Sequence, residues 1–273
     1  MTVHQPQSGV PAPRIAAFFD LDKTIIATSS AAAFSRPFYA GGLISKTAAL
    51  RSAYAHFLYM MGGANADQTE RMRSQLSALV TGWPVDQVTS IVSETLHKYI
   101  DPYVYAEALD LIREHKAAGH DVIIVSASGS EVVIPIASML GADHAIASRM
   151  EIVDGKYTGT IDFYAYGEHK ATAIQDLAKK RGYDLARSFA YSDSVTDVPM
   201  LSTVGNAFTV NPDRNFRKVA EDNSWECLTF ERPVTLRRLS TPAKSAAIVG
   251  SAVLVGLSIG YAIRTLRQRG AKR

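Results

Sequence analysis

The sequence predicts an α/β fold whose functional groups lie along one edge of a parallel sheet. Three short apolar segments support this prediction, because each of them runs directly into polar residues: 14–19, 121–125 and 189–191. Longer stretches with helical apolar periodicity separate the segments, as is expected when helices connect parallel strands. Ligands bind at the carboxyl ends of strands in open α/β sheets. The polar residues that follow these segments are therefore the first candidates for a functional site.

The composition fits a globular enzyme with a sizeable core. The chain has 273 residues, of which 47% are hydrophobic, enough for one large or two modest domains. The formal net charge of +3 is small and the basic residues are scattered except near the C-terminus, so nucleic acid is not an expected partner. Cys227 is the only cysteine, which excludes an intramolecular disulfide, and the seven histidines show no spacing typical of a zinc site.

Residues 1–13 are predicted to form a disordered leader. They contain Pro6, Gly9, Pro11 and Pro13 among polar residues and lack the long apolar core of a secretory signal. The catalytic part is therefore expected in the cytoplasm.

The first predicted strand ends at two aspartates, Asp20 and Asp22. In an Asp-x-Asp turn both side chains can point into one crevice, where one carboxylate attacks and the other transfers a proton. Two acids so close repel each other unless a cation neutralises one or a proton occupies the other. Taken alone, the pair also fits a capping or turn role, because aspartate is favoured at strand-to-helix turns.

Four helical patterns follow before the next strand. Residues 27–39 are rich in alanine, residues 46–61 carry one apolar stripe, and residues 67–80 and 85–99 are separated by a Gly-Trp-Pro turn. An insertion of helices between the first and second strands is therefore predicted. No residue of this insertion gives a signal strong enough to assign it a role in substrate binding.

The second strand contains a run of β-branched residues without polar alternation, which predicts burial on both faces. Ser126 follows this strand at the edge where a phosphate would bind. A helix is expected from about Glu131, and the free N–H groups at a helix start favour a bound phosphate. Ser128 or Ser130 has the alternative role of capping this helix.

A hairpin and a further helix come next. Residues 142–147 predict a strand, and the Asp154-Gly155 pair is typical of a type I′ hairpin turn. Lys170 stands at the start of the predicted helix. A lysine is most often an ordinary exposed residue, but the place of this one between the other polar clusters favours a functional role.

The predicted strand at 189–191 leads into an acidic loop with Asp193 and Asp197. Two carboxylates within one turn suit hard cations such as Mg²⁺, which bind carboxylate oxygens and water. The alternative is that Asp193 only caps the following helix, but Asp20 would then lack a counter-charge. Residues 207–210 are expected to form the last strand of the core.

Taken in order, these clusters resemble the four motifs of the haloacid dehalogenase (HAD) superfamily, in its phosphoserine-phosphatase-like subfamily IB. The resemblance rests on the loop from Asp20 to Thr24, on Ser126, on Lys170, and on Asp193 with Asp197, and it covers roughly residues 14–215. It implies a Rossmann-like HAD core with a parallel sheet, formed by residues 14–26 and 104–235. It also implies an inserted helical cap of the C1 type at residues 27–103.

The same resemblance implies a role for each motif residue. Asp20 would be the nucleophile and Asp22 the acid–base residue, while Ser126 and Lys170 would bind the phosphate. A Mg²⁺ cofactor would be bound by Asp20, by the backbone carbonyl of Asp22, and by Asp193 and Asp197, the last either directly or through water. The implied enzyme is a HAD-type phosphatase, a phosphoric monoester hydrolase.

Two positions depart from typical phosphoserine phosphatases. Lys23 stands where a serine is common in them, and Ser126 is followed by Ala127 and Ser128 in place of a glycine pair. Both departures argue against phosphoserine as the substrate.

The C-terminal part predicts a membrane anchor. After a linker at 236–244, residues 245–263 form a stretch of nineteen residues without charge. At about 1.5 Å per residue, such a helix spans a bilayer core. Basic residues on both sides, including the basic tail 264–273, attract anionic headgroups but give no orientation. The alternative is a packed terminal helix. Gly256 and Gly260 have the spacing that lets two such helices touch in a homodimer, a weak signal on its own.

These expectations combine into one predicted function. The chain is expected to be a Mg²⁺-dependent phosphomonoester hydrolase at the cell membrane, with a single C-terminal anchor and a cytoplasmic catalytic domain. It would act through an aspartyl-phosphate on a lipid or lipid-precursor phosphate, such as lysophosphatidic acid or phosphatidylglycerol phosphate. The alternatives are a phosphatase of phosphoserine or another small metabolite and, from another class, a catalytically inactive membrane-tethered binding protein.

Overall fold

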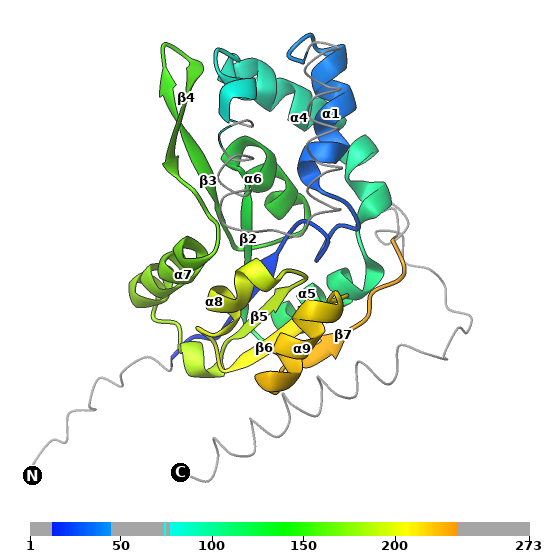
Figure 1. Cartoon of the computed structure of the whole chain (residues 1–273), viewed down its shortest axis with the longest axis vertical. Coiled ribbons are helices and arrows are strands. Elements are labelled where there is room, and N and C mark those ends of the chain that lie inside the picture. The colour runs from blue at the N-terminus through cyan, green and yellow to red at the C-terminus, as the bar shows by residue number, and fades with distance from the viewer. Residues whose placement is uncertain (1–12, 45–73, 75–76, 234–273) are drawn as a thin grey trace, which may run out of the picture. The chain divides into compact units, whose positions relative to one another are not determined.

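The computed structural model describes residues 13–44, 74 and 77–233, and the strands within them form one seven-stranded sheet (Figure 1). The strand order is β4-β3-β2-β1-β5-β6-β7, and every neighbouring pair is parallel except the antiparallel pair β3 and β4. The strands are β1 (Ala16–Asp20), β2 (Asp121–Gly129), β3 (His144–Val153), β4 (Lys156–Phe163), β5 (Phe189–Ser192), β6 (Asn206–Val210) and β7 (Glu226–Leu228). The predicted α/β fold with a mostly parallel sheet is confirmed.

Helices connect most of these strands. The helices are α1 (Ser30–Ala40), α4 (Val85–Tyr99), α5 (Ala106–Ala117), α6 (Ser130–Met139), α7 (Glu168–Arg181), α8 (Val198–Leu201) and α9 (Arg214–Asp222). Short 3₁₀ turns complete the set: η1 (Asp101–Tyr103), η2 (Leu185–Arg187) and η3 (Val195–Asp197). The predicted helix at 85–99 coincides with α4, while residues 46–61 and most of 67–80 lie outside the described residues.

The expectation that residues 207–210 form the last core strand is wrong, because α9 and β7 follow. The helix begins where the Asp213 carboxylate accepts a hydrogen bond from the Phe216 N–H at 2.7 Å, a regular N-cap. The strand β7 has only three residues and pairs with β6 alone. A strand this short leaves no periodicity to detect in the sequence.

The central strand β1 is buried on both faces because its side chains alternate between two aromatic or aliphatic layers. Phe18 belongs to a core cluster that includes Ile174 of α7 and Phe216 of α9. Phe19 points to the other face, where its ring stacks on Tyr191 of β5 at a centroid distance of 4.4 Å. The apolar layers on both faces fix the position at which β1 ends.

The strand register places the predicted site residues at one edge of the sheet. Asp20 pairs with Val125, so Ser126 lies one residue further along the neighbouring strand β2. On the other side Phe19 pairs with Tyr191, so Ser192 is level with Asp20 and Asp193 comes next. The carboxyl ends of the adjacent parallel strands β2, β1 and β5, with the polar residues that follow them, therefore lie at the same edge of the sheet.

Main-chain hydrogen bonds join the described part of the helical insertion between β1 and β2 to the rest of the fold at two places. At its base, the Ala27 N–H donates to the Tyr103 carbonyl at 2.7 Å, and the Tyr105 N–H donates to the Ile25 carbonyl at 2.9 Å. Within the insertion α1 packs against α4, and α4 also packs against α6 of the core (Figure 1).

The second contact is made by the β3–β4 hairpin. The Val85 N–H donates to the Gly155 carbonyl at 3.0 Å, and Gly82 and Tyr157 form a similar main-chain bond at 2.8 Å. The hairpin turn itself has positive φ angles at Asp154 (50°) and Gly155 (73°), as a type I′ turn requires. The predicted turn type is thus confirmed, and the hairpin braces the insertion at the start of α4.

The last described residues return to the base of the insertion. The Ala106 N–H donates to the Arg232 carbonyl at 2.8 Å, and Tyr105 and Pro233 form an antiparallel bridge. Within the described ranges no helix combines the length and apolar character needed to cross a bilayer. The predicted anchor at 245–263 lies outside those ranges, as does nearly all of the leader.

Candidate active site

Lys170 lies between two of the predicted carboxylates. Its Nζ donates to Asp20 Oδ1 at 2.6 Å and to Asp197 Oδ2 at 2.7 Å. All three residues are almost completely buried, Lys170 being 3% exposed. The structure therefore brings together residues that are 150 positions apart in the chain.

The position of Lys170 depends on the turn that begins α7. Gly167 precedes this helix with φ 54° and ψ −126°, a conformation that suits glycine. Lys170 is consequently in the first turn, where the helix dipole disfavours a positive charge. The carboxylates of Asp20 and Asp197 compensate for this unfavourable electrostatic placement. A lysine with no role beyond folding is not expected at such a position.

Burial and the neighbouring charges act in opposite directions on Lys170. Burial alone would lower the pKa of the ammonium, but the carboxylates of Asp197 and Asp20 outweigh it and raise the pKa above its usual range. The lysine therefore stays positively charged. The same burial raises the pKa of Asp20 well above its usual range against the opposing effect of Lys170, with further contributions from the Asp197 and Asp193 charges.

Asp193 joins the cluster from the loop after β5. Its backbone N–H donates to Thr24 Oγ1 at 3.0 Å, and the Thr24 hydroxyl lies 3.4 Å from Asp193 Oδ1. Burial raises the pKa of Asp193 to about 6, against the opposing charge of Lys23. Asp193 is not a helix cap, because Ser194 caps η3 and accepts from Thr196 N–H. The capping alternative for Asp193 is therefore wrong.

Asp22 faces a different set of partners from Asp20. Its carboxylate accepts hydrogen bonds from Ser30 and Ser128 at distances between 2.8 and 3.2 Å. Burial raises the pKa of Asp22, while these hydrogen bonds oppose the rise. The two aspartates of the Asp-x-Asp turn thus occupy separate environments, as separate roles would require.

Ser126 lies at the edge of the sheet beside Asp20 and is 1% exposed. Its Oγ accepts from the Ser128 N–H at 3.2 Å. The expected helix starts at Ser130 with Gly129 as its N-cap, and no side chain caps it. Ser128 and Ser130 are therefore not caps, and the capping alternative for both is wrong.

Four supporting residues were not predicted. Thr24 links the first loop to the acidic loop, Ser192 donates to Asp197 Oδ2 at 2.7 Å, and Ser30 and Ser128 bind Asp22. The partners of Thr24 and Ser128 are more than 100 positions away in the sequence, while those of Ser192 and Ser30 are 5 and 8 positions away. A serine or threonine gives no local signal of such a contact, so only the fold reveals it.

The donor set suits a magnesium ion. Three carboxylates, those of Asp20, Asp193 and Asp197, share the single ammonium of Lys170, which leaves two negative charges without a buried partner in the described part of the chain. One divalent cation balances that charge. Mg²⁺ prefers oxygen ligands and commonly takes only one or two carboxylates together with water.

Among the described residues, no three acidic, histidine or cysteine side chains lie close enough to form a ready metal cluster. The physical reason is that Lys170 draws the Asp20 and Asp197 carboxylates toward itself. Asp197 is further engaged by Ser192. Asp197 Oδ2 therefore accepts from two donors, Lys170 and Ser192.

The raised pKa of Asp193 predicts how stability depends on pH when metal is removed. The folded protein holds the Asp193 proton up to about pH 6, whereas the free side chain releases it near 3.8. The stabilisation from this proton is full below pH 3.8 and is lost as the pH rises through 6. We expect a loss of about 1–3 kcal/mol in the free energy of unfolding over this range, which Asp193→Asn abolishes.

Urea unfolding in EDTA, measured across that pH range, tests this expectation. Asp176→Asn is the matched control, because the Asp176 side chain is 57% exposed on α7. If the free energies of unfolding of the native chain and of Asp193→Asn differ by the same amount at every pH, the raised pKa of Asp193 is wrong.

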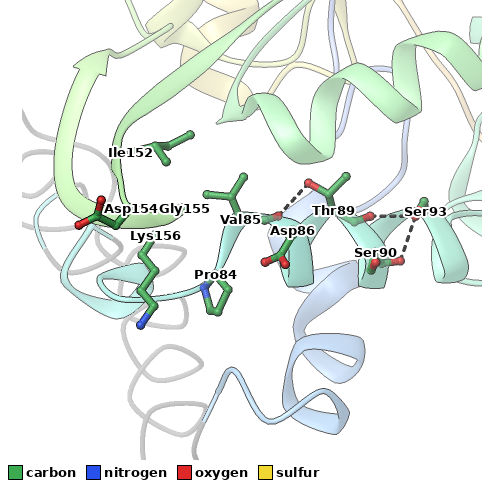
Figure 2. Close-up of a pocket in the computed structure, with 10 residues that line it drawn as sticks. All are labelled: Pro84, Val85, Asp86, Thr89, Ser90, Ser93, Ile152, Asp154, Gly155 and Lys156. Atoms are coloured by element: carbon green, nitrogen blue, oxygen red, sulfur yellow. Dashed lines mark hydrogen bonds between the residues drawn. The ribbon is translucent and has the colours of Figure 1, made fainter.

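A hollow between α4 and the β3–β4 turn lies outside this cluster (Figure 2). None of the predicted site residues lines it. Its hydroxyl groups bond to the helix itself: Thr89 Oγ1 donates to the Val85 carbonyl at 2.9 Å, and Ser93 Oγ lies 2.9 Å from the Thr89 carbonyl. The buried acidic cluster at the sheet edge, which combines a lysine with three carboxylates, is therefore the better candidate.

The fold and the cluster define a class of α/β protein with a buried aspartate at the end of the central strand. A model of the haloacid dehalogenase-like hydrolase family matches residues 17–202. The chain belongs to this family. The predicted identification as a HAD-type phosphatase is confirmed.

Similar proteins are known from several bacteria. The chain is 55% identical, over 93% of its length and 88% of the other protein, to a "Probable phosphatase" of Mycobacterium tuberculosis (strain ATCC 25618 / H37Rv). It is 32% identical to the "Phosphoserine phosphatase SerB1" of the same strain, over 89% of this chain and 80% of that protein. A crystal structure of a protein with unknown function from Bordetella pertussis Tohama I matches with a TM-score of 0.69 and 29% identity, over 80% of this chain and 99% of the other.

Proposed function

We propose that this chain is a Mg²⁺-dependent phosphomonoester hydrolase that works through a covalent phosphate on Asp20. The observation that carries the proposal is the ion-paired cluster in which Lys170 bridges Asp20 and Asp197 at the end of the central strand. A buried lysine beside a carboxylate nucleophile is well placed to hold phosphoryl oxygens. Ser126, on the adjacent strand, supplies a hydroxyl at the same edge.

In the first step an Asp20 oxygen attacks phosphorus. A bond forms between Asp20 and the phosphorus atom, and the bond from phosphorus to the ester oxygen breaks. Asp22 gives its proton to the departing oxygen, so that the product leaves as an alcohol. Lys170 and Ser126 hold the phosphoryl oxygens, over which negative charge spreads in the transition state.

In the second step water removes the phosphate from Asp20. Asp22, now ionised, takes a proton from the attacking water, whose oxygen forms a bond to phosphorus as the bond between Asp20 and phosphorus breaks. Inorganic phosphate leaves, Asp20 is again a carboxylate and Asp22 is again protonated. The raised pKa of Asp22 suits this exchange, because burial favours the protonated form without fixing it.

The metal would be held by Asp20, by the backbone carbonyl of Asp22 and by Asp193, with Asp197 behind a water. When bound, it would supply the positive charge that lets an anionic nucleophile approach an anionic ester. In its absence the chain offers only Lys170 for this purpose within the buried cluster that the structure describes.

Mg²⁺ should therefore stabilise the folded chain. At one hundred times its dissociation constant, a ligand that binds only the folded state adds about 2.7 kcal/mol. We expect the melting temperature to rise on addition of MgCl₂ to the EDTA-treated protein, and the rise to disappear in Asp193→Asn. The exposed-site variant Asp176→Asn should retain it. An equal rise in both variants would count against Asp193 as a ligand.

The substrate class that we favour is the phosphate ester of a small metabolite. The relative named "Phosphoserine phosphatase SerB1" supports this class, and the departures at Lys23 and Ser128 argue for a leaving group other than serine. A lipid or lipid-precursor phosphate is the second candidate. It is favoured by the uncharged stretch 245–263, which would also place the chain at the cell membrane with its catalytic part in the cytoplasm.

Hydrolysis of p-nitrophenyl phosphate in MgCl₂ tests the reaction class, because an inactive membrane-tethered binding protein would show none. A panel with the full-length chain then ranks the substrates: phosphoserine, histidinol phosphate, lysophosphatidic acid and phosphatidylglycerol phosphate in micelles. A higher kcat/KM on the soluble esters supports the favoured class. A preference for the micellar esters, together with binding of the chain to anionic vesicles, supports the lipid class and the membrane location.

A further inference from the structure

The Asp22 carboxylate is held on both of its oxygens. Oδ1 accepts from the backbone N–H of Ser30 at 2.8 Å, and Oδ2 accepts from the hydroxyls of Ser30 at 3.2 Å and Ser128 at 3.1 Å. The two hydroxyl oxygens lie 2.8 Å from each other. Donors on both oxygens restrict rotation about both side-chain torsions, so the direction of the carboxylate is fixed.

The two serines come from separate parts of the fold. Ser30 is the first residue of α1 in the helical insertion and is fully buried, while Ser128 lies near the end of β2 in the core. Neither hydroxyl serves as a helix cap, because Ser29 caps α1 and Gly129 precedes α6. In the described part of the chain, both hydroxyls instead contact Asp22 and each other.

We propose that Ser30 and Ser128 are positioning residues that aim the Asp22 carboxylate at the leaving-group oxygen. The inference rests on the proposed function, in which Asp22 protonates that oxygen. Because Ser30 begins α1, the orientation of Asp22 also depends on the place of the first helix of the insertion. The first helix of the insertion thereby supports the proton transfer.

A positioning role has a signature that a purely structural role lacks. Proton donation matters most when the leaving group is a strongly basic anion, such as an alkoxide. It matters little for p-nitrophenolate, which is weakly basic and leaves unprotonated. Loss of either hydroxyl should therefore slow the hydrolysis of an alkyl phosphate selectively. General acid–base catalysis contributes roughly 10²–10⁴-fold, and misdirecting the acid forfeits part of this.

The test compares Ser30→Ala, Ser128→Ala and the double variant on p-nitrophenyl phosphate and on β-glycerol phosphate. We expect kcat on the glycerol ester to fall by about 10- to 100-fold in each single variant, with KM nearly unchanged. On the nitrophenyl ester kcat should fall less than about 3-fold. In an Asp22→Asn background the serine substitutions should have no further effect, because they act through Asp22.

Ser29→Ala is the matched control. It removes the cap of α1 one residue away, where the Ser29 hydroxyl oxygen accepts from the Ala32 N–H at 3.1 Å, without touching Asp22. It should lower the melting temperature but leave the ratio of the two rates unchanged. If Ser30→Ala does not fold, Ser128→Ala alone decides, because Ser128 is only partly buried.

Equal losses on both esters, or additive losses in the Asp22→Asn background, would overturn the positioning role while leaving the proposed function intact. A native chain without activity on either ester would overturn the proposed function and this inference together.

Discussion

Replacing Asp20 by asparagine is expected to abolish turnover while leaving the fold intact. The amide has the shape of the carboxylate but cannot attack phosphorus, so we expect kcat on p-nitrophenyl phosphate to fall by at least about 10⁴-fold. The substitution removes an ion pair with Lys170, but it also removes the repulsion from the Asp197 and Asp193 carboxylates, and Lys170 keeps Asp197 as a partner. The melting temperature should therefore change by only a few degrees.

Two measurements make the Asp20 result decisive. The native chain, quenched during turnover and digested, should yield a phosphorylated peptide containing Asp20, and Asp20→Asn should yield none. Asp20→Ala guards against deamidation of the asparagine back to aspartate. Appreciable turnover in Asp20→Ala with a native-like melting curve would remove the covalent mechanism. The control Asp176→Asn, with an exposed carboxylate, should behave as the native chain does.

Replacing Lys170 by methionine is expected to damage both stability and activity. The substitution keeps the length of the side chain but leaves Asp20 and Asp197 buried without their shared ammonium, which now lies 2.6 and 2.7 Å from them. Removing one partner of a buried ion pair costs about 3–5 kcal/mol. For a domain of this size that corresponds to a fall in melting temperature of roughly 10 °C.

The pH dependence of the Lys170→Met variant distinguishes lost charge from lost packing. Without the ammonium, the buried carboxylates take up protons more readily than in the unfolded chain. Their protonated forms stabilise the fold at low pH, and this stabilisation is lost as the pH rises. The free energy of unfolding of Lys170→Met should therefore be only slightly below that of the native chain at acidic pH and far below it near neutral pH. Adding Asp197→Asn to Lys170→Met should restore part of the lost free energy of unfolding, because it removes one of the unpaired carboxylates.

The control for this variant is Lys179→Met, on the same helix. The Lys179 side chain is 77% exposed and its Nζ lies 3.5 Å from Asp176 Oδ1. The substitution should therefore change the free energy of unfolding by no more than about 0.5 kcal/mol. A deficit in Lys170→Met that does not vary with pH would indicate a packing defect instead of an unpaired charge. A Lys170→Met protein that keeps full activity would remove the phosphate-binding role.

The sequence allowed the position of the cluster to be predicted because each of its charged members follows a strong local pattern. Asp20 and Asp193 follow apolar strands that the register aligns side by side, and Lys170 follows a glycine turn. Parallel strands that are buried on both faces have little freedom in where they end. The convergence of their polar ends is therefore readable from the order of the segments.

The supporting contacts could not be predicted in the same way. Ser30 and Ser128 are 98 positions apart, and their hydroxyls meet because α1 begins beside the end of β2. Ser128 has the sequence context of a helix cap, and that local interpretation is wrong because the strand continues through Gly129. Long-range hydrogen bonds of small polar residues have no periodic signature, so tertiary structure alone decides them.

The route by which the chain leaves the described domain has a geometric consequence. Strand β7 runs parallel to β6, so its exit lies on the same side of the sheet as the end of β1. Pro233 then forms a bridge with Tyr105, next to the base of the insertion. The described chain therefore ends beside the base of the insertion, and any group attached further along the polypeptide is joined to the domain at that point.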